Sequence, residues 1–327
     1  MAEFKVVIPA AGGGTRLRPH TYVVPKVLLE VAGKPIIGHI VDRVLRAGPL
    51  EVCVVVGDSG EEIEAYLRGA FDCRFRFVHQ AEPLGLGHAV YQARVCFDGE
   101  PALVLLGDTI VEASLSAMLG DKNVIGVKEV EDPRRFGVVE YEGGRVLRVI
   151  EKPEVPPSNL AVVGVYFIKD TNALFQSLGR MITQGRQTRG EFQLTDALQM
   201  MIEQGVPFET VPVDDWLDCG TPDALLATNR HLLATSGQWV PRDGVVVVPP
   251  VFIHDGAVVE HSVVGPDVSI GDGARVTGSV VRDSIIGRGA VVDRSVLERS
   301  ILGERAEVSD APRRLNLGAF SCVQNEG

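Results

Sequence analysis

Residues 4–26 of this chain read FKVVIPAAGGGTRLRPHTYVVPK, an apolar run followed by a glycine-rich turn. Residues 4–8 are almost continuously apolar and rich in β-branched side chains, the pattern of a strand buried on both faces. Three glycines at 12–14 follow where this strand is expected to end. Backbone N–H groups of glycine can approach a bound anion closely because no side chain intervenes. The stretch therefore predicts a phosphate-binding turn, with Arg16 and Lys26 as positive charges against a triphosphate.

A glycine triplet is also typical of an ordinary tight turn between a strand and a helix. The dinucleotide-binding pattern Gly-x-Gly-x-x-Gly is not completed, because position 17 is Leu. No Gly-Lys-Ser/Thr follows the glycines, so the P-loop pattern is absent as well. Any phosphate site at this turn is therefore of another kind.

The run Ala10-Ala11-Gly12-Gly13-Gly14-Thr15-Arg16-Leu17, with Pro25-Lys26, resembles the opening motif of the sugar-1-phosphate nucleotidylyltransferases. This family includes the glucose-1-phosphate thymidylyl- and uridylyltransferases, and the resemblance continues to about residue 230. It implies catalytic roles for Arg16 and Lys26 against the triphosphate. It also implies that the nucleotide is contacted by Ala10, Gly12, Gly13, Gly14 and Thr15.

The composition excludes several classes of protein. The chain has 327 residues, of which 45% are hydrophobic and 23% charged, as in a soluble protein with two domains. A formal net charge of −11 disfavours a nucleic-acid partner. No apolar run approaches the roughly 20 residues of a membrane helix, and no signal-peptide pattern is present, so we expect a cytoplasmic protein without a membrane partner. The five cysteines form no Cys-x-x-Cys pair, which argues against a disulfide framework and a zinc site.

Strand and helix patterns alternate along the first two thirds of the chain. Helical spacing occurs at 35–45, 61–67, 89–97 and 222–233, and strand patterns at 51–56, 75–78, 102–106, 161–168 and 208–213. The alternation predicts an α/β fold, a Rossmann-like and mainly parallel sheet with helices on both faces. Ligands of such sheets bind beyond the carboxyl ends of the strands.

Polar residues follow several of these strand ends. Gln80 and Gly85 could read the edge of a base or simply form a turn before a helix, and the resemblance implies contact with a pyrimidine. Asp108 follows one buried strand and Asp218 another, and each could cap the next segment. Two such carboxylates also suit Mg²⁺, which takes few protein ligands. In the family the matching residues hold the metal, and Asp108 is also expected to contact the nucleotide.

The middle of this domain is assigned to the sugar. Strand patterns at 136–139 and 146–150 lead to Glu151-Lys152-Pro153, which by itself could be a charged turn. The resemblance implies that Glu151 binds sugar hydroxyls and that Lys152 contacts the sugar phosphate in a catalytic role. Glu191 matches a further motif, although residues 190–196 could equally begin a helix. The other sugar-binding positions implied are Gly137, Gly164 and Tyr166.

Composition changes after residue 235, and short apolar pairs recur every five or six residues from 245 to 308. This internal repeat resembles a left-handed parallel β-helix of hexapeptides, with about three or four coils. Hexapeptide acyltransferases use the same helix, but no long inserted loop that would build an acyl-CoA site is present, so we favour a structural role. A short stack is often completed by another subunit, which predicts a homo-oligomer. The expected domains are 1–235 and 241–310, followed by a tail at 311–327.

Together with these features, the family resemblance implies a Mg²⁺-dependent nucleotidyltransferase. It would transfer a nucleotidyl group from dTTP or UTP to glucose 1-phosphate, forming dTDP-glucose or UDP-glucose and pyrophosphate. One alternative is the same reaction on N-acetylglucosamine or mannose 1-phosphate, and another is a non-catalytic relative that binds sugar nucleotides or assists assembly. Base and sugar preference stay open because residues frequent in the family are replaced at Pro9, Ala11, Thr109 and Cys219.

Overall fold

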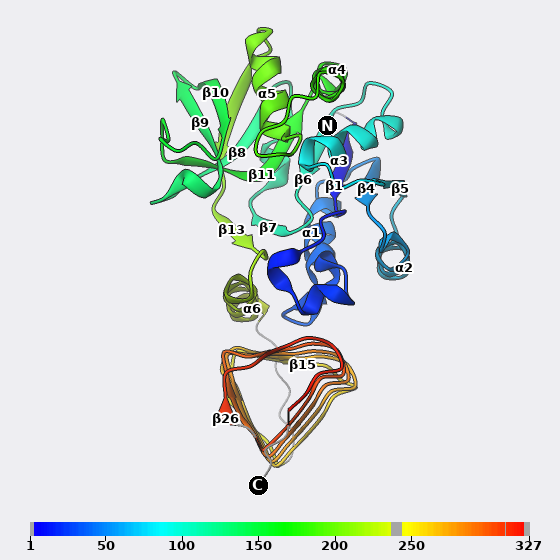
Figure 1. Ribbon diagram of the computed structural model, residues 1–327, viewed down its shortest axis with the longest axis vertical. Helices are drawn as coiled ribbons and strands as arrows, with labels where there is room; N and C mark the ends of the chain where they lie inside the picture. The colour runs from blue at the N-terminus through cyan, green and yellow to red at the C-terminus, as the bar shows by residue number, and fades with distance from the viewer. Residues whose placement is uncertain (1–2, 237–243, 311, 324–327) are drawn as a thin grey trace. The chain divides into compact units, whose positions relative to one another are not determined.

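The structure, a computed structural model, describes residues 3–236, 244–310 and 312–323 (Figure 1). Its contacts divide the chain into two compact units. The first unit comprises Met1–Gly12 and Gly38–Trp216, and the second comprises Gly13–Ile37 and Leu217–Gly327. In this division residues 13–37, the glycine-rich segment, group with the C-terminal part of the chain.

A nine-stranded sheet forms the first unit. The strands pair in the order β10-β9-β11-β6-β1-β4-β5, with β8 against β11 and β12 against β8. Their bounds are β1 (Lys5–Pro9), β4 (Glu51–Val56), β5 (Phe75–His79), β6 (Ala102–Leu105), β8 (Asn123–Glu129), β9 (Gly137–Glu142), β10 (Arg145–Glu151), β11 (Leu160–Ile168) and β12 (Phe208–Pro212). Strands β6, β1, β4 and β5 run parallel, as does β12 beside β8, whereas β11 is antiparallel to β6, β8 and β9. The sheet is therefore mixed, with the predicted parallel order in the half that contains β1.

Helices cover both faces of this sheet. On one face, Val7 and Val104 share a core with residues of α3 (Leu86–Gln92), α4 (Thr171–Thr183) and α5 (Leu194–Glu203). Val6 and Ile8 point to the opposite face, since side chains alternate along a strand, and they are equally buried. The remaining helices of the first unit are α1 (Ile36–Leu45) and α2 (Gly60–Ala70). The α/β class predicted from the alternation is confirmed, although α4, α5 and β8 were not predicted. No helix in the described part of the chain combines the length and apolar character needed to cross a membrane.

Three parallel sheets, each of five strands, form the β-helix of the second unit, which has a triangular cross-section (Figure 1). The first sheet contains β14 (Val246–Val247), β17 (Val263–Val264), β20 (Val280–Arg282), β23 (Val296–Glu298) and β26 (Pro312–Arg313). The second contains β15 (Val251–Ile253), β18 (Val268–Ile270), β21 (Ile285–Ile286), β24 (Ile301–Leu302) and β27 (Asn316–Leu317). The third contains β16 (Val258–Glu260), β19 (Arg275–Thr277), β22 (Val291–Asp293), β25 (Glu307–Ser309) and β28 (Cys322–Val323).

The strands stack in register, so that inward-facing apolar residues of successive coils form columns. Val264, Val281 and Leu297 form such a column, and each is fully buried. β26, β27 and β28 complete a fifth coil inside the segment expected to be a tail, so the predicted three or four coils were too few. The last coil was missed because two of its three strands, Pro312–Arg313 and Asn316–Leu317, lack the pair of apolar residues on which the repeat was recognised.

Helix α6 (Pro222–Ser236) packs against the β-helix. Arg230 binds Asp283 through two hydrogen bonds of 2.6 and 3.1 Å. Asp223, two turns earlier on α6, accepts hydrogen bonds from Arg299 and Arg314 of later coils. Opposite charges thus face each other along the helix, which fixes the position of α6 on the coils.

Candidate active site

The candidate residues fall in both units. In the second unit, Gly14 closes the glycine turn in a left-handed conformation, with φ of +58°. Its carbonyl accepts hydrogen bonds from the Leu17 N–H at 2.9 Å and from the Thr21 hydroxyl at 2.8 Å. A Cβ on Gly14 would lie 2.9 Å from Cγ2 of Thr21 and 3.0 Å from Cβ of Lys26, so only glycine fits. Gly13 beside it is exposed, and a Cβ there would meet no atom within 4 Å, so its backbone is accessible to a ligand.

Two charged candidates meet beside Gly220. A Cβ on this glycine would lie 2.8 Å from Nη2 of Arg16 and 2.9 Å from Oδ1 of Asp218. Asp218 is the last residue of β13 (Asp215–Asp218), and its carbonyl accepts a hydrogen bond from Thr228 of α6 at 3.0 Å. Lys26 is only 8% exposed, and its side chain packs against Gly14. The second unit thus gathers an open backbone turn, two cations and one carboxylate.

In the first unit, Gln80 is buried directly after β5. Its amide nitrogen lies 3.3 Å from the Gly85 carbonyl and 2.9 Å from Nδ1 of His88, whose other ring nitrogen pairs with Gln92. Burial lowers the pKa of His88, which favours the neutral ring. Gly85 has φ of +110°, and a Cβ there would lie 2.8 Å from the Phe192 carbonyl oxygen. The packing of the chain therefore requires glycine at this position, whether or not a nucleotide base binds beside it.

Asp108 lies beyond the carboxyl end of β6, as predicted. Its Oδ1 accepts a hydrogen bond from Thr109 at 3.2 Å. The preceding Gly107 N–H donates to the Pro9 carbonyl at 3.2 Å, which brings the ends of β6 and β1 together within the first unit. Ala10, which follows β1, is buried to 7% exposure. This edge of the sheet is where ligands of parallel sheets bind.

Glu151 ends β10 in the first unit, and its side chain is only 9% exposed. One carboxylate oxygen accepts a hydrogen bond from Thr195 at 2.9 Å, and the other lies 3.0 Å from Nζ of Lys152. A Cβ on Gly137 would lie 3.0 Å from Cγ2 of Thr195 and 3.4 Å from Oε2 of Glu151. The absent side chain at Gly137 therefore leaves space directly beside this carboxylate.

Lys152 has φ of +43°, a left-handed conformation that is rare for a residue with a side chain. Its N–H donates to the Phe136 carbonyl at 3.0 Å, and its own carbonyl accepts a hydrogen bond from Arg189 at 2.9 Å. Such a conformation costs about 1–2 kcal/mol, so its surroundings must hold it. Strained residues of this kind cluster at functional sites.

The other sugar candidates lie in different environments. Tyr166 is 3% exposed within the core, where burial and then the charge of Glu151 raise the pKa of its hydroxyl. Gly164 has φ of +81°, and a Cβ there would lie 2.5 Å from Leu106, so packing alone requires glycine. Glu191 is exposed and accepts a hydrogen bond from Gln193 at 3.1 Å.

Three residues beside these candidates were not predicted as functional: Thr195, Arg189 and His88. Thr195 lies in the motif that contains Glu191, and His88 in the motif that contains Gly85, so the sequence carried a signal for both. Arg189 reaches Lys152 from a distant loop, and no pattern marks it.

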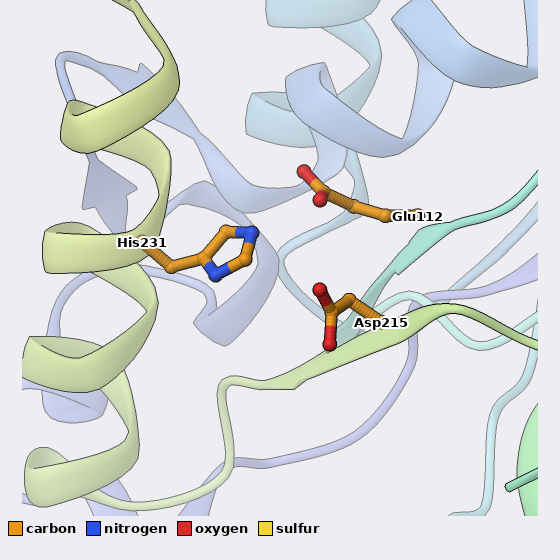
Figure 2. A group of neighbouring side chains, drawn as sticks. All are labelled: Glu112, Asp215 and His231. Atoms are coloured by element: carbon orange, nitrogen blue, oxygen red, sulfur yellow. The ribbon is translucent and has the colours of Figure 1, made fainter.

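A separate pair of carboxylates lies elsewhere in the first unit. Oxygens of Glu112, in β7 (Thr109–Glu112), and Asp215, in β13, lie within 4.8 Å of each other (Figure 2). Glu112 accepts a hydrogen bond from Arg43 at 3.2 Å, and Asp215 accepts one from Lys128 at 2.9 Å. Each carboxylate has its own cation, so the pair requires no metal ion to balance its charge. The third side chain of the figure, His231, lies on α6 and belongs to the second unit.

Comparison with known proteins gives a consistent result. Residues 5–235 match the nucleotidyl transferase family. A glucose-1-phosphate thymidylyltransferase of Streptomyces griseus is 35% identical over 295 residues, covering 85% of this chain and 80% of that protein. The enzyme of the same name from Streptomyces antibioticus is 32% identical and covers 86% of each chain. Among solved structures, a UDP-glucose pyrophosphorylase complexed with UDP-glucose aligns with a TM-score of 0.62 and 26% identity, covering 72% of this chain and 99% of that one.

Proposed function

Since this chain belongs to the nucleotidyl transferase family, we propose that it transfers a thymidylyl or uridylyl group from dTTP or UTP to glucose 1-phosphate, with release of pyrophosphate. The observation that carries the proposal is the open glycine turn of the second unit, with Arg16 beside Asp218 and Lys26 against Gly14. The two Streptomyces relatives are named for thymidylyl transfer, so dTTP is the first nucleotide to test.

The reaction requires positioning more than covalent chemistry. A phosphate oxygen of the sugar 1-phosphate attacks the α-phosphorus in line, and pyrophosphate leaves. Nucleophile and leaving group are already anionic, so neither a general base nor a covalent nucleophile is required. Arg16, Lys26 and the backbone N–H groups of the glycine turn would hold the triphosphate, against the overall charge of −11.

The family implies a Mg²⁺ ion, and we propose Asp108 and Asp218 as its ligands. Both are carboxylates next to strand ends, and oxygen ligands of this type suit a hard cation. Oδ1 of Asp218 projects to the same place beside Gly220 as the Arg16 guanidinium, among the groups assigned to the triphosphate. A bound Mg²⁺ would add positive charge against the phosphate oxygens.

For the sugar 1-phosphate, we propose that Lys152 binds the phosphate and that Glu151 accepts hydrogen bonds from sugar hydroxyls. A carboxylate has about four acceptor positions, and Thr195 and Lys152 occupy two on Glu151, so others are left for a ligand. Gly137, Gly164, Tyr166 and Glu191 complete the proposed sugar site. Gln80 would read the base from its anchored position beside His88. Uracil and thymine differ by one methyl group, worth only about 1–3 kcal/mol, so both nucleotides are candidates.

The test is product formation across dTTP, UTP, ATP and GTP, each with glucose, N-acetylglucosamine or mannose 1-phosphate and Mg²⁺. We expect turnover with dTTP or UTP and glucose 1-phosphate. Asp108→Asn should remove most of this turnover, whereas Asp121→Asn, which removes a fully exposed carboxylate paired with Lys169, should leave it unchanged. A folded protein that is inactive with every pair would refute the enzyme and favour a non-catalytic sugar-nucleotide-binding relative.

We also propose that the chain forms a homo-oligomer through the β-helix, supported by the tendency of short coil stacks to be completed by a neighbour. Light scattering at micromolar concentration would test this, because a single species at the monomer mass would contradict it. The nucleoside triphosphate substrate agrees with the expected cytoplasmic location.

A further inference from the structure

The glycine-rich segment, Gly13–Ile37, forms one compact unit with Leu217–Gly327. It carries Gly14, Arg16 and Lys26, to which nucleotide binding is assigned above. The β-helix carries no assigned residue, yet it contacts this segment at two places far apart in sequence.

The first contact holds a hairpin formed by β2 (Glu30–Val31) and β3 (Lys34–Pro35). Its turn residue Ala32 has φ of +49°, and the Ala32 N–H donates to Oδ1 of Asn229 at 2.8 Å. Asn229 of α6 is fully buried, and its Oδ1 also accepts a hydrogen bond from Ser269 of β18 at 2.9 Å. Its amide group donates to the Asp267 carbonyl at 3.2 Å. One buried side chain thus connects the hairpin, α6 and the β-helix.

The tip of the same hairpin lies directly on an aromatic ring of the first coil. A Cβ on Gly33, whose φ is +78°, would lie 2.2 Å from Cε1 of Phe252. Real Cβ atoms do not come this close to a neighbour, so a residue larger than glycine would force either the hairpin or the Phe252 ring to move.

The second contact lies just after the glycine turn and involves the last coil. Nε2 of His20 lies 2.6 Å from Oδ1 of Asn316 in β27. Pro19 packs against Gly318, where a Cβ would lie 2.9 Å from Cβ of Pro19. His20 is 3% exposed, and burial lowers the pKa of its ring. Asn316 belongs to the fifth coil, which lies in the segment expected to be a tail.

This second contact connects directly to the glycine turn. His20 and Thr21 belong to the same 3₁₀ turn (His20–Tyr22), and the Thr21 hydroxyl donates to the Gly14 carbonyl at 2.8 Å. A shift of His20 therefore shifts Thr21 and, through it, Gly14. The path from the β-helix to the turn consists of two hydrogen bonds and one peptide bond.

From these contacts we propose that the β-helix holds the nucleotide-binding segment in place, with Asn316 and Asn229 as positioning residues for the triphosphate. The proposal rests on the nucleotide site proposed above, but the docking of the segment does not depend on catalysis. An open glycine turn has many accessible conformations, and holding it in one of them lowers the cost of ordering it when a ligand binds. A β-helix of five coils thus has a use in this chain other than oligomerisation or acyl transfer.

The test compares Asn316→Ala with Asp310→Ala by hydrogen exchange and nucleotide titration. Asn316 is exposed on the last coil, so its truncation should leave the fold intact. Asp310 is also exposed on the β-helix, where it pairs with Arg294 and does not contact the segment in any described interaction. The probes are the amides of Leu17, Tyr22 and Val24, each hydrogen-bonded within the segment, and the affinities for dTTP and UTP.

For Asn316→Ala we expect these amides to exchange about 3- to 10-fold faster, the effect of one lost hydrogen bond, while amides of β4 keep their rates. Saturating dTTP should slow the exchange again, and the dissociation constant should rise, because ligand binding and docking are linked. His20→Asn, which removes the other partner, should give the same result, and the double variant should be no worse than either single change.

Unchanged exchange, or equal acceleration in Asp310→Ala, would overturn the docking role. Faster exchange with unchanged dTTP and UTP affinity in both single variants and the double variant would overturn the positioning role. Failure of the proposed function is distinct, because it appears in the unaltered chain as absent turnover with any sugar 1-phosphate.

Discussion

The substitution Thr195→Val tests whether Glu151 contacts the sugar. The change replaces a hydroxyl with a methyl group of similar size, and so removes the 2.9 Å hydrogen bond to Oε2 of Glu151. The Cγ2 methyl group that faces Gly137 is retained, so packing at this place changes little. The consequence falls on the orientation of a carboxylate that is only 9% exposed.

The size of the effect follows from the type of bond. A hydrogen bond to a charged group contributes about 1.5–3 kcal/mol, and each 1.4 kcal/mol is a factor of ten in affinity. Its loss could therefore weaken binding of the sugar by about 10- to 150-fold. The lower part of this range is expected, because the Lys152 ammonium still holds the other carboxylate oxygen at 3.0 Å. Sugar hydroxyls bind Glu151 in both ground and transition state, so the loss should raise KM for glucose 1-phosphate more than it lowers kcat.

The assay is steady-state pyrophosphate release at saturating dTTP with glucose 1-phosphate varied. The matched control is Thr183→Val, which removes a hydroxyl bonded to the Gly179 carbonyl at the exposed end of α4. We expect at least a tenfold higher KM for glucose 1-phosphate in Thr195→Val and no change in the control. An unchanged KM for glucose 1-phosphate, or a rise in KM for dTTP of the same size, would refute a sugar-binding role for Glu151.

Three further predictions follow from the same structure. Asp108→Asn should remove most turnover while far-ultraviolet circular dichroism stays that of the parent, and a fully active variant would remove this residue from the metal site. Lys152→Gly should leave the free energy of unfolding within about 1 kcal/mol of the parent, because relief of the left-handed strain at φ of +43° offsets the greater entropy of glycine in the unfolded chain. Activity on the sugar phosphate should nevertheless be lost. A large loss of stability in urea would contradict this prediction. The pKa of His20 lies below its unfolded value of 6.5, so the unfolded state binds a proton more readily and the stability of the fold should decrease as the pH drops below that value. Between pH 7 and 5.5 the urea midpoint should therefore decrease less in His20→Asn than in the parent. An equal decrease in both proteins would argue against a buried neutral ring.

Much of the sheet was predictable because buried parallel strands leave continuous apolar runs. β1, β4, β5, β6, β11 and β12 each lie within one residue of the predicted bounds. Helix α4 was missed although Leu174, Leu178 and Met181 have helical spacing and are fully buried, so the same criterion could have found it.

The organisation of the second unit was less accessible from sequence. The contacts of His20 with Asn316 and of Ala32 with Asn229 join positions hundreds of residues apart, and single polar residues carry no periodic signal. The last coil was overlooked for a related reason, since parallel strands pair through their backbones and do not need a pair of apolar side chains in each strand. The candidate site residues at strand ends were predictable from the sequence. The residues that hold them in position, such as Thr195 and Arg189, were not, because their roles depend on tertiary contacts.

The most direct test of the central claim is phosphorus NMR of one mixture of protein, dTTP, glucose 1-phosphate and Mg²⁺. We predict that pyrophosphate and dTDP-glucose appear at equal rates, and that neither forms without the sugar phosphate or after addition of a chelator. Substituting UTP should give the same one-to-one pattern or none, according to base preference. Release of phosphate from dTTP independent of sugar, or pyrophosphate without a sugar nucleotide, would contradict nucleotidyl transfer to a sugar 1-phosphate.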